Sequence, residues 1–186
     1  MRSTEELRNE HEGVGLMLKI LVAATAKMEK GERVAKEDLE GMGEFLTVFV
    51  DKCHHGKEED ILFPAMEAAG VPREGGPIGV MLAEHAEGRR LVKLLKGVFE
   101  ECGAGGEGAA KKAGEVAREY ADLMDGHIEK ENNVLYPMGE RLISEKKDGE
   151  MMEAFEKLEE ERIGAGRHEA FHAMMGKMEK KYLNGQ

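Results

Sequence analysis

The sequence has no tryptophan, four prolines and two cysteines among 186 residues. Two cysteines, Cys53 and Cys102, are too few for the disulfide framework of a secreted domain, so we expect reduced thiols in a cytoplasmic protein. The first residues, MRSTEELRNEHEG, lack the apolar stretch of a signal peptide. No apolar run approaches the length needed to span a bilayer.

Positive charge is also scarce. Lys and Arg number 27 against 38 Asp and Glu, which gives a net charge of −11. Nucleic acids and anionic membrane surfaces would repel such a chain, so neither is expected as a partner. The oligomeric state stays open.

The alternating pattern of β-strands is missing, and long stretches with helical periodicity take its place. Ser3 to Glu6 fits a capping box in which Ser3 is the cap and Glu6 reaches back to it. The predicted helices cover residues 3–30, 36–69, 78–102 and 109–147, with a glycine-rich break at 103–108, and a last helix from about 149 is interrupted at 164–166.

Four long helices joined by short turns predict an all-α protein, an up-down four-helix bundle with an additional C-terminal helix. We assign residues 1–147 to the bundle and residues 148–186 to a C-terminal helical extension packed on it. The 13 methionines are scattered, which favours a role as core filler over copper binding.

The chain contains an internal repeat. His11 and His85 lie 74 residues apart, and the pattern EExxLFP at 58–64 returns as ENxxLYP at 131–137, an offset of 73. The bundle is therefore expected to consist of two helical hairpins with the same chemistry in each.

Two overlapping pairs compete for the inner face of the second helix, His54/Glu58 and His55/Glu59. Neighbouring helical residues point about 100° apart, so only one pair can face fully into the core. The first pair lies on the more apolar row, and the repeat aligns it with His127 and the glutamate four residues later. We interpret His55 as a non-ligand that could support a ligand.

Each of the four inner helix faces thus carries one histidine, and two also carry a glutamate. One histidine on an apolar face is usually a hydrogen-bonded core residue. Six such groups are different, because each unpartnered one costs roughly 1–3 kcal/mol against a net stability of about 5–15 kcal/mol. A bound cation removes this conflict. The predicted metal ligands are His11, His54, Glu58, His85, His127 and Glu131.

Two carboxylates from facing helices can bridge two metal ions. Imidazole and carboxylate without thiolate suit iron, manganese or zinc. Six side chains cannot fill two octahedral shells, which leaves positions for an oxo or hydroxo bridge and a small ligand. The order His-x-x-x-Glu is the reverse of the Glu-x-x-His motif of ferritin-like carboxylate proteins.

Three segments, HHGKEEDILFP, GPIGVMLAEHAEGR and HIEKENNVLYP, together resemble the hemerythrin-like, HHE cation-binding domain. They are particularly similar to its variant in the di-iron iron–sulfur-cluster repair proteins, over roughly residues 5–145. The resemblance implies a non-haem di-iron centre held by the six residues above, with both glutamates bridging. Arg89 stands where oxygen-carrying hemerythrins have a second histidine in the third helix, and Asn132 stands where they have an aspartate.

The last helix contains RHEAFH, residues 167–172, which matches the zinc peptidase motif HExxH. Its position after a glycine break, near the C-terminus, leaves no room for the rest of a peptidase site. We predict instead that His168 is a further metal ligand that replaces the missing third-helix histidine. The alternative is that His168 and His172 are capping or surface residues.

Three classes of function remain open. The leading one is a non-haem di-iron protein that binds oxygen or nitric oxide for sensing, storage or delivery. The alternative is an enzyme or repair factor that reduces nitric oxide or peroxide, or donates iron to damaged iron–sulfur clusters. The third is an iron sensor that unfolds when metal is lost.

Overall fold

The computed structural model describes residues 1–103, 106, 108–164 and 166–184, and in these ranges the chain forms six helical rods. The predicted breaks at 103–108 and 164–166 include residues 104, 105, 107 and 165, which lie outside the described residues. The first and third rods are α1 (Arg2–Glu29) and α5 (Pro77–Gly103). The second rod comprises α2 (Lys36–Glu44), η1 (Phe45–His54), α3 (His55–Lys57), η2 (Glu58–Leu62) and α4 (Phe63–Ala68). The fourth comprises α6 (Ala109–Lys130), η3 (Glu131–Leu135) and α7 (Tyr136–Leu142), and α8 (Glu145–Arg162) and α9 (Arg167–Tyr182) follow.

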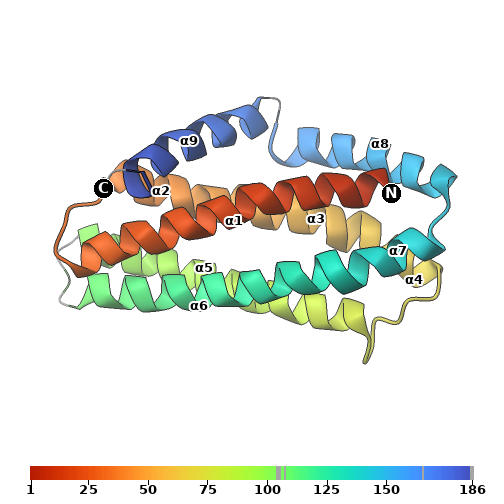
Figure 1. Ribbon diagram of the computed structural model, residues 1–186, viewed down its shortest axis with the longest axis horizontal. Coiled ribbons are helices and arrows are strands. Elements are labelled where there is room, and N and C mark those ends of the chain that lie inside the picture. The colour runs from red at the N-terminus through yellow and green to blue at the C-terminus, as the bar shows by residue number, and fades with distance from the viewer. Residues whose placement is uncertain (104–105, 107, 165, 185–186) are drawn as a thin grey trace.

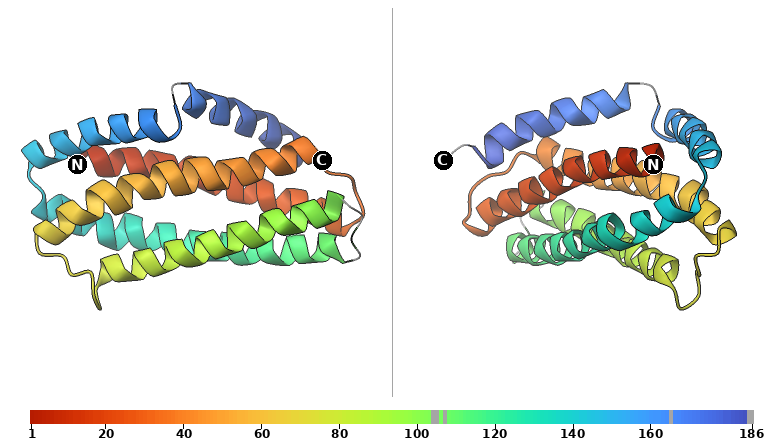
Figure 2. Two further views of the ribbon diagram at one scale, coloured as in Figure 1. Left: turned by 180° about the vertical axis from the view of Figure 1, so that it is seen from behind. Right: turned by 45° about the vertical axis from the view of Figure 1, so that its right-hand side comes forward.

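The first four rods run alternately up and down and form a four-helix bundle (Figure 1). This confirms the predicted all-α bundle. The C-terminal extension consists of two helices, α8 and α9, which lie along one side of the bundle against α1 and the second rod (Figure 2). No helix in the described part of the chain is long and apolar enough to cross a membrane.

Most predicted helix ends agree with the structure, because glycine ends helices where a positive φ is required. Gly31 follows α1 with φ of +80°, and Gly70 follows the second rod with φ of +99°. L-residues rarely adopt this backbone conformation, which explains why both helices stop where the sequence places a glycine.

Two boundary predictions were wrong. Ser3 lies inside α1 and caps nothing. Instead, Asp148 of α8 accepts hydrogen bonds from the backbone N–H groups of Arg2 and Ser3 at 2.8 and 3.1 Å, and from Ser3 Oγ at 2.6 Å. The fourth rod ends at Leu142 rather than near 147, because Ser144 caps α8 through its side chain.

The three segments η1, η2 and η3 are π-helical, and η2 and η3 begin with Glu58 and Glu131. Pro64 and Pro137 each stand two residues beyond such a segment. Proline lacks an N–H and its ring collides with the carbonyl four residues earlier in an α-helix, so a wider turn upstream relieves the collision. The LFP and LYP patterns thus explain the π-helical turns at both glutamates.

The core consists of two apolar clusters rather than one. In each rod the histidine of the predicted site lies between a residue of the smaller cluster and a residue of the larger one. A polar layer therefore crosses the bundle between the two clusters. The flanking pairs, smaller cluster first, are Leu7 and Val14 in α1, Leu62 and Val50 in the second rod, Met81 and Leu91 in α5, and Leu135 and Met124 in the fourth rod.

Replacing Asp148 with alanine should lower the free energy of unfolding by about 1–2 kcal/mol at pH 7, because the start of α1 loses its cap. Burial raises the pKa of Asp148, but hydrogen bonds from Ser3 and Arg2 outweigh it and lower the pKa. The stabilisation is therefore full above the pKa of an unfolded aspartate, about 3.9, and is lost as the pH falls through the lower folded value. Urea unfolding at pH 7 and at pH 3 measures both effects. The exposed Glu145, changed to alanine, is the control, and an equal loss in both variants would contradict the capping role.

Candidate metal centre

Six of the seven predicted ligands lie in the polar layer and are buried. The four rods contribute one histidine each, and the second and fourth rods add Glu58 and Glu131. Both glutamates are 0 % exposed, and the most exposed of the four histidines, His11, reaches 5 %. Side chains from every rod thus meet in one enclosed space.

The four histidines form two pairs. The Nε2 atoms of His11 and His54 lie 3.1 Å apart, and those of His85 and His127 also lie 3.1 Å apart. Two nitrogen atoms at right angles on one ion, each about 2.1 Å from it, would be separated by about 3.0 Å. Each pair is therefore spaced to share one metal ion.

Each glutamate faces both histidine pairs. Its carboxylate contacts one or more imidazoles of each pair, which is the arrangement needed to bridge two ions. Two groups of potential ligands can be defined by mutual distance, and Glu58 belongs to both. The nitrogen–oxygen distances are 3.8 Å for His54 to Glu58, 3.4 Å for His85 to Glu58, 3.2 Å for His11 to Glu131 and 3.1 Å for His127 to Glu131.

Three carboxylate oxygens in this layer have no hydrogen-bond partner among the described residues: Glu58 Oε2 and both oxygens of Glu131. A buried, unpartnered polar atom costs about 1–3 kcal/mol, and a charged one costs more. A cation between the histidine pairs would satisfy all three. The donor set, imidazole nitrogen with carboxylate oxygen and no thiolate, fits iron, manganese or zinc.

A ring of hydrogen bonds holds the histidines in orientation. The Nδ1–H group of each donates to an oxygen on another rod, which fixes the tautomer and directs the Nε2 lone pair inward. Such outer partners are typical of metal-binding histidines. The partners are Asn132 for His11 (3.0 Å), Glu10 for His54 (2.7 Å), Glu59 for His85 (2.7 Å) and Glu84 for His127 (2.9 Å).

Sequence reasoning missed these partners, although the repeat contains a signal for them. Every partner is the chain neighbour of a predicted ligand: Glu10 and Glu84 each precede a predicted ligand histidine, and Glu59 and Asn132 each follow a predicted ligand glutamate. A lysine also recurs at the same offset. Lys57 Nζ donates to Glu10 at 2.6 Å, and Lys130 contacts Glu84.

The layer favours positive charge. Burial lowers the pKa of His85, but the carboxylates of Glu131, Glu58 and Glu59 outweigh it and raise the pKa to about 11. Burial likewise raises the pKa of Glu131, but the surrounding imidazoles, His127 above all, hold it well below its usual value. The site therefore keeps Glu131 ionised and holds a proton on His85, where a metal ion would bind.

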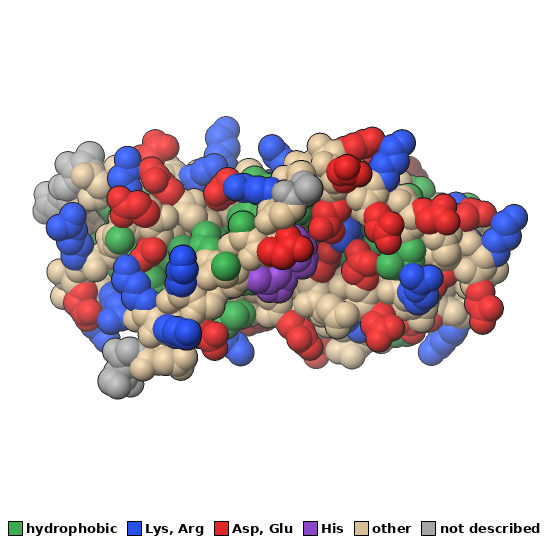
Figure 3. Space-filling model, turned by 90° about the horizontal axis from the view of Figure 1, so that it is seen from above, with side chains coloured by type: hydrophobic (Ala, Val, Ile, Leu, Met, Phe, Trp, Pro, Cys, Tyr) green, Lys and Arg blue, Asp and Glu red, His purple; other side chains and the backbone are tan. Residues whose placement is uncertain are grey.

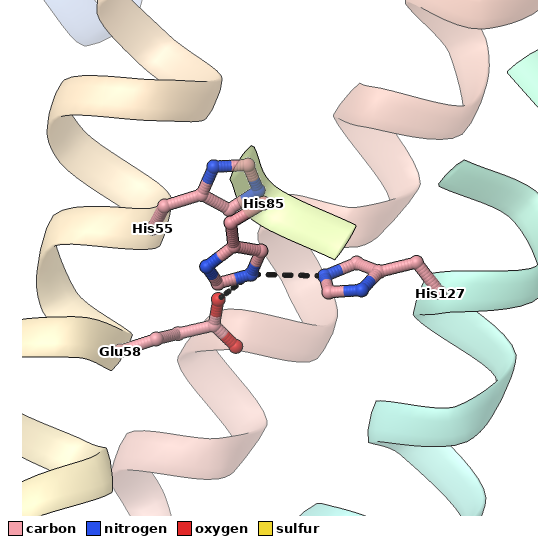
Figure 4. A group of neighbouring side chains, drawn as sticks. All are labelled: His55, Glu58, His85 and His127. Carbon is pink, nitrogen blue, oxygen red and sulfur yellow. Dashed lines mark hydrogen bonds and ion pairs between the residues drawn. The ribbon is translucent and has the colours of Figure 1, made fainter. Parts of the chain in front are cut away.

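His55 is also buried, with 3 % exposed, which the sequence did not predict. Its partner Glu59 is 24 % exposed, so His54/Glu58 is the pair that lies fully in the core. The ring of His55 stacks on that of His85, with centroids 3.8 Å apart (Figure 4). The rod passes from π-helix to α-helix at His54 and His55. A π-helical turn is wider than an α-helical one, so neighbouring side chains diverge less.

The structure does not bring His168 to this layer. Among the described residues, His168 and His172 of α9 belong to neither group of potential ligands. The ring of His168 lies 5.3 Å from Phe49 and 4.7 Å from His172. His168 and His172 are the two histidines that are not buried. On the side of the molecule formed by α8 and α9, histidine is visible at the surface among acidic side chains (Figure 3).

With this geometry in view, comparison with known proteins gives the family. A family model, the hemerythrin HHE cation-binding domain, matches residues 2–139. The chain therefore belongs to the hemerythrin HHE cation-binding family.

Its similar relatives include the iron-sulfur cluster repair protein YtfE of Salmonella newport (strain SL254), Salmonella heidelberg (strain SL476) and Salmonella agona (strain SL483). Each is 31% identical over 121 residues, which cover 63% of this chain and 55% of the relative. The chain thus spans about half the length of the curated relatives that it matches.

Metal binding should release protons. Imidazole must lose its proton to bind a metal ion, and the pKa of His85 is about 11, so loading metal-free protein with Fe²⁺ or Zn²⁺ at pH 7 should acidify a weakly buffered solution. Affinity should rise with pH, because protons compete less as their concentration falls. A pH indicator measures the release, with protein already loaded as the control. Binding without proton release would contradict the charge state described above.

Replacing His127 with alanine should remove metal, whereas replacing His168 should not, because only His127 lies in the polar layer. Metal analysis and the visible spectrum after reconstitution with iron measure the outcome. We expect the His168→Ala protein to match the wild type and the His127→Ala protein to lose metal affinity by at least about tenfold. A changed metal content or spectrum in His168→Ala would restore His168 as a ligand.

Proposed function

We propose that the protein binds two iron ions through His11, His54, Glu58, His85, His127 and Glu131, and that it acts in the repair of damaged iron–sulfur clusters. The histidines and glutamates of the polar layer are the evidence for the iron centre, and the likeness to iron-sulfur cluster repair proteins is the evidence for the repair role. This favours the repair factor over the simple carrier of oxygen or nitric oxide. Damaged clusters are the proposed partners.

The observation that carries this proposal is the set of three unpartnered carboxylate oxygens between two histidine pairs. Iron held there would supply redox chemistry toward nitric oxide or peroxide, and a store of iron for a damaged cluster. The neighbouring imidazoles offset the charge of these oxygens only in part, and no hydrogen bond among the described residues satisfies them. A pair of ions between the histidine pairs would complete the balance.

The chain's own groups prepare the site for this role. Tyr136 Oη donates to Glu58 Oε1 at 2.6 Å and its ring stacks on His11, so one carboxylate oxygen is fixed while the other stays free. The two apolar clusters on either side of the layer limit the access of water. Arg89 binds Asp51 and Glu59 at the rim, so the third rod contributes His85 alone to the centre.

A cavity reaches the edge of this layer at His55. This cavity of about 460 Å³ is lined by His55, Gly88 and Tyr120 among others. A Cβ atom added at Gly88 would come 3.6 Å from the Tyr120 ring, which is an ordinary contact. The lack of a side chain at Gly88 therefore enlarges the cavity by little more than the volume of a methyl group. Nitric oxide or peroxide is small enough to use this cavity.

The repair role can be tested with a [4Fe–4S] hydro-lyase inactivated by nitric oxide. Iron-loaded protein, a reductant and the damaged enzyme are mixed, and the recovery of hydro-lyase activity is followed. The wild type should restore activity at least about tenfold faster than Glu131→Gln, which loses a bridging oxygen and with it metal affinity. His172→Ala, a histidine outside the polar layer, is the matched control.

Equal recovery with wild type and Glu131→Gln would contradict the repair role of the iron centre. Retention of two iron ions per chain without any recovery would leave an iron protein of another function. In that case, reversible spectral change under oxygen or nitric oxide would support the carrier instead.

A further inference from the structure

Within the described residues, His55 is the histidine of the polar layer whose two ring nitrogens both lack a hydrogen-bond partner. The other four histidines each donate through Nδ1 to an oxygen on another rod. A buried imidazole with two unpartnered nitrogens, placed among metal ligands, has a coordination role open to it. We propose that His55 is a metal ligand, the third imidazole on the ion held by His85 and His127, a proposal that rests on the di-iron function above.

Distances place His55 with this ion rather than with the other. Potential ligand atoms of His55, Glu58, His85 and His127 all lie within 4.8 Å of one another (Figure 4). His55 is absent from the group formed around His11. Its ring lies against that of His85, with centroids 3.8 Å apart, whereas the rings of His54 and His127 lie 5.7 and 6.0 Å away.

His55 shares one feature with three of the other histidines, a carboxylate near Nδ1, although no hydrogen bond joins the two groups. His55 Nδ1 lies 3.7 Å from Asp51 Oδ1, one turn earlier on the same rod. Asp51 is held in turn by Arg89, whose Nε donates to Oδ1 at 2.6 Å. A carboxylate beside Nδ1 favours a proton on that nitrogen, which leaves the Nε2 lone pair for a metal ion.

His55 also breaks the internal repeat. At the offset of 73 residues, the position of His55 is taken by Ile128 in the second half of the chain, whereas the ligand positions of His54 and Glu58 are kept. The ion at His85 and His127 would therefore bind three imidazoles, and the ion at His11 and His54 only two. The two metal positions become chemically different although the rods around them repeat.

The number of bound imidazoles can be counted in the wild-type protein. In protein loaded with Co²⁺, each imidazole bound through Nε2 gives one strongly shifted, solvent-exchangeable Nδ1–H proton signal in the NMR spectrum. We expect five such signals. Four signals in protein that holds two Co²⁺ ions would overturn the role of His55 and leave the proposed function standing, whereas fewer than two ions in protein loaded with either Co²⁺ or Fe²⁺ would overturn both.

A variant assigns the fifth signal. His55→Ile introduces the residue that the repeat has at the equivalent position, and circular dichroism of the metal-free protein verifies that it folds. We expect one signal fewer with Co²⁺, and an affinity for one of the two iron ions at least about tenfold lower than in the wild type. His172→Ala should retain five signals and both ions. Unchanged signals and affinity in His55→Ile would overturn the proposal.

Discussion

The structure depends on one energetic cost to which all four rods contribute. They bury a layer of imidazoles and carboxylates between two apolar clusters. Water cannot reach these groups, so their charges must be balanced within the layer. A proton on His85, whose pKa is raised to about 11, does this in part. The three carboxylate oxygens left without partners show that protons do not complete the balance. Fold and metal binding are therefore two aspects of one electrostatic requirement, because the elements that close the core also carry the charges.

The twofold repeat extends beyond the ligands to the residues that hold them. Glu10 of the first rod orients a histidine of the second, and Glu84 of the third rod does the same for the fourth. A hydrogen bond therefore joins the two rods of each hairpin. Glu59 and Asn132 connect the hairpins to each other, from the second rod to the third and from the fourth to the first. A site of this kind can arise by duplication of one hairpin and then be varied at single positions.

Much of this arrangement follows from the sequence, because helical periodicity and the repeat fix which face of each helix is inward. The structure places His54, and not His55, beside His11, although its role as a ligand stays a prediction. The burial of His55 could not be predicted, since it depends on a π-helical turn that the 100° rule for an α-helix does not describe. The predicted cap of α1 was wrong because the residue that caps this helix, Asp148, is 145 residues from Ser3 in the sequence. Local patterns carry no information on a contact of that range.

Lys57 connects the C-terminal extension with the polar layer. Its ammonium group, 1 % exposed, binds Glu159 of α8 at 3.0 Å and Glu10 of α1 at 2.6 Å, and Glu10 in turn accepts the Nδ1–H of His54. The more negative charge Glu10 retains, the more electron density His54 can donate to a bound ion. The reduction potential of an iron ion bound beside His54 would therefore depend on α8 as well as on the bundle. Substitutions in α8 would then alter the redox properties of the proposed centre without any change in its proposed ligands.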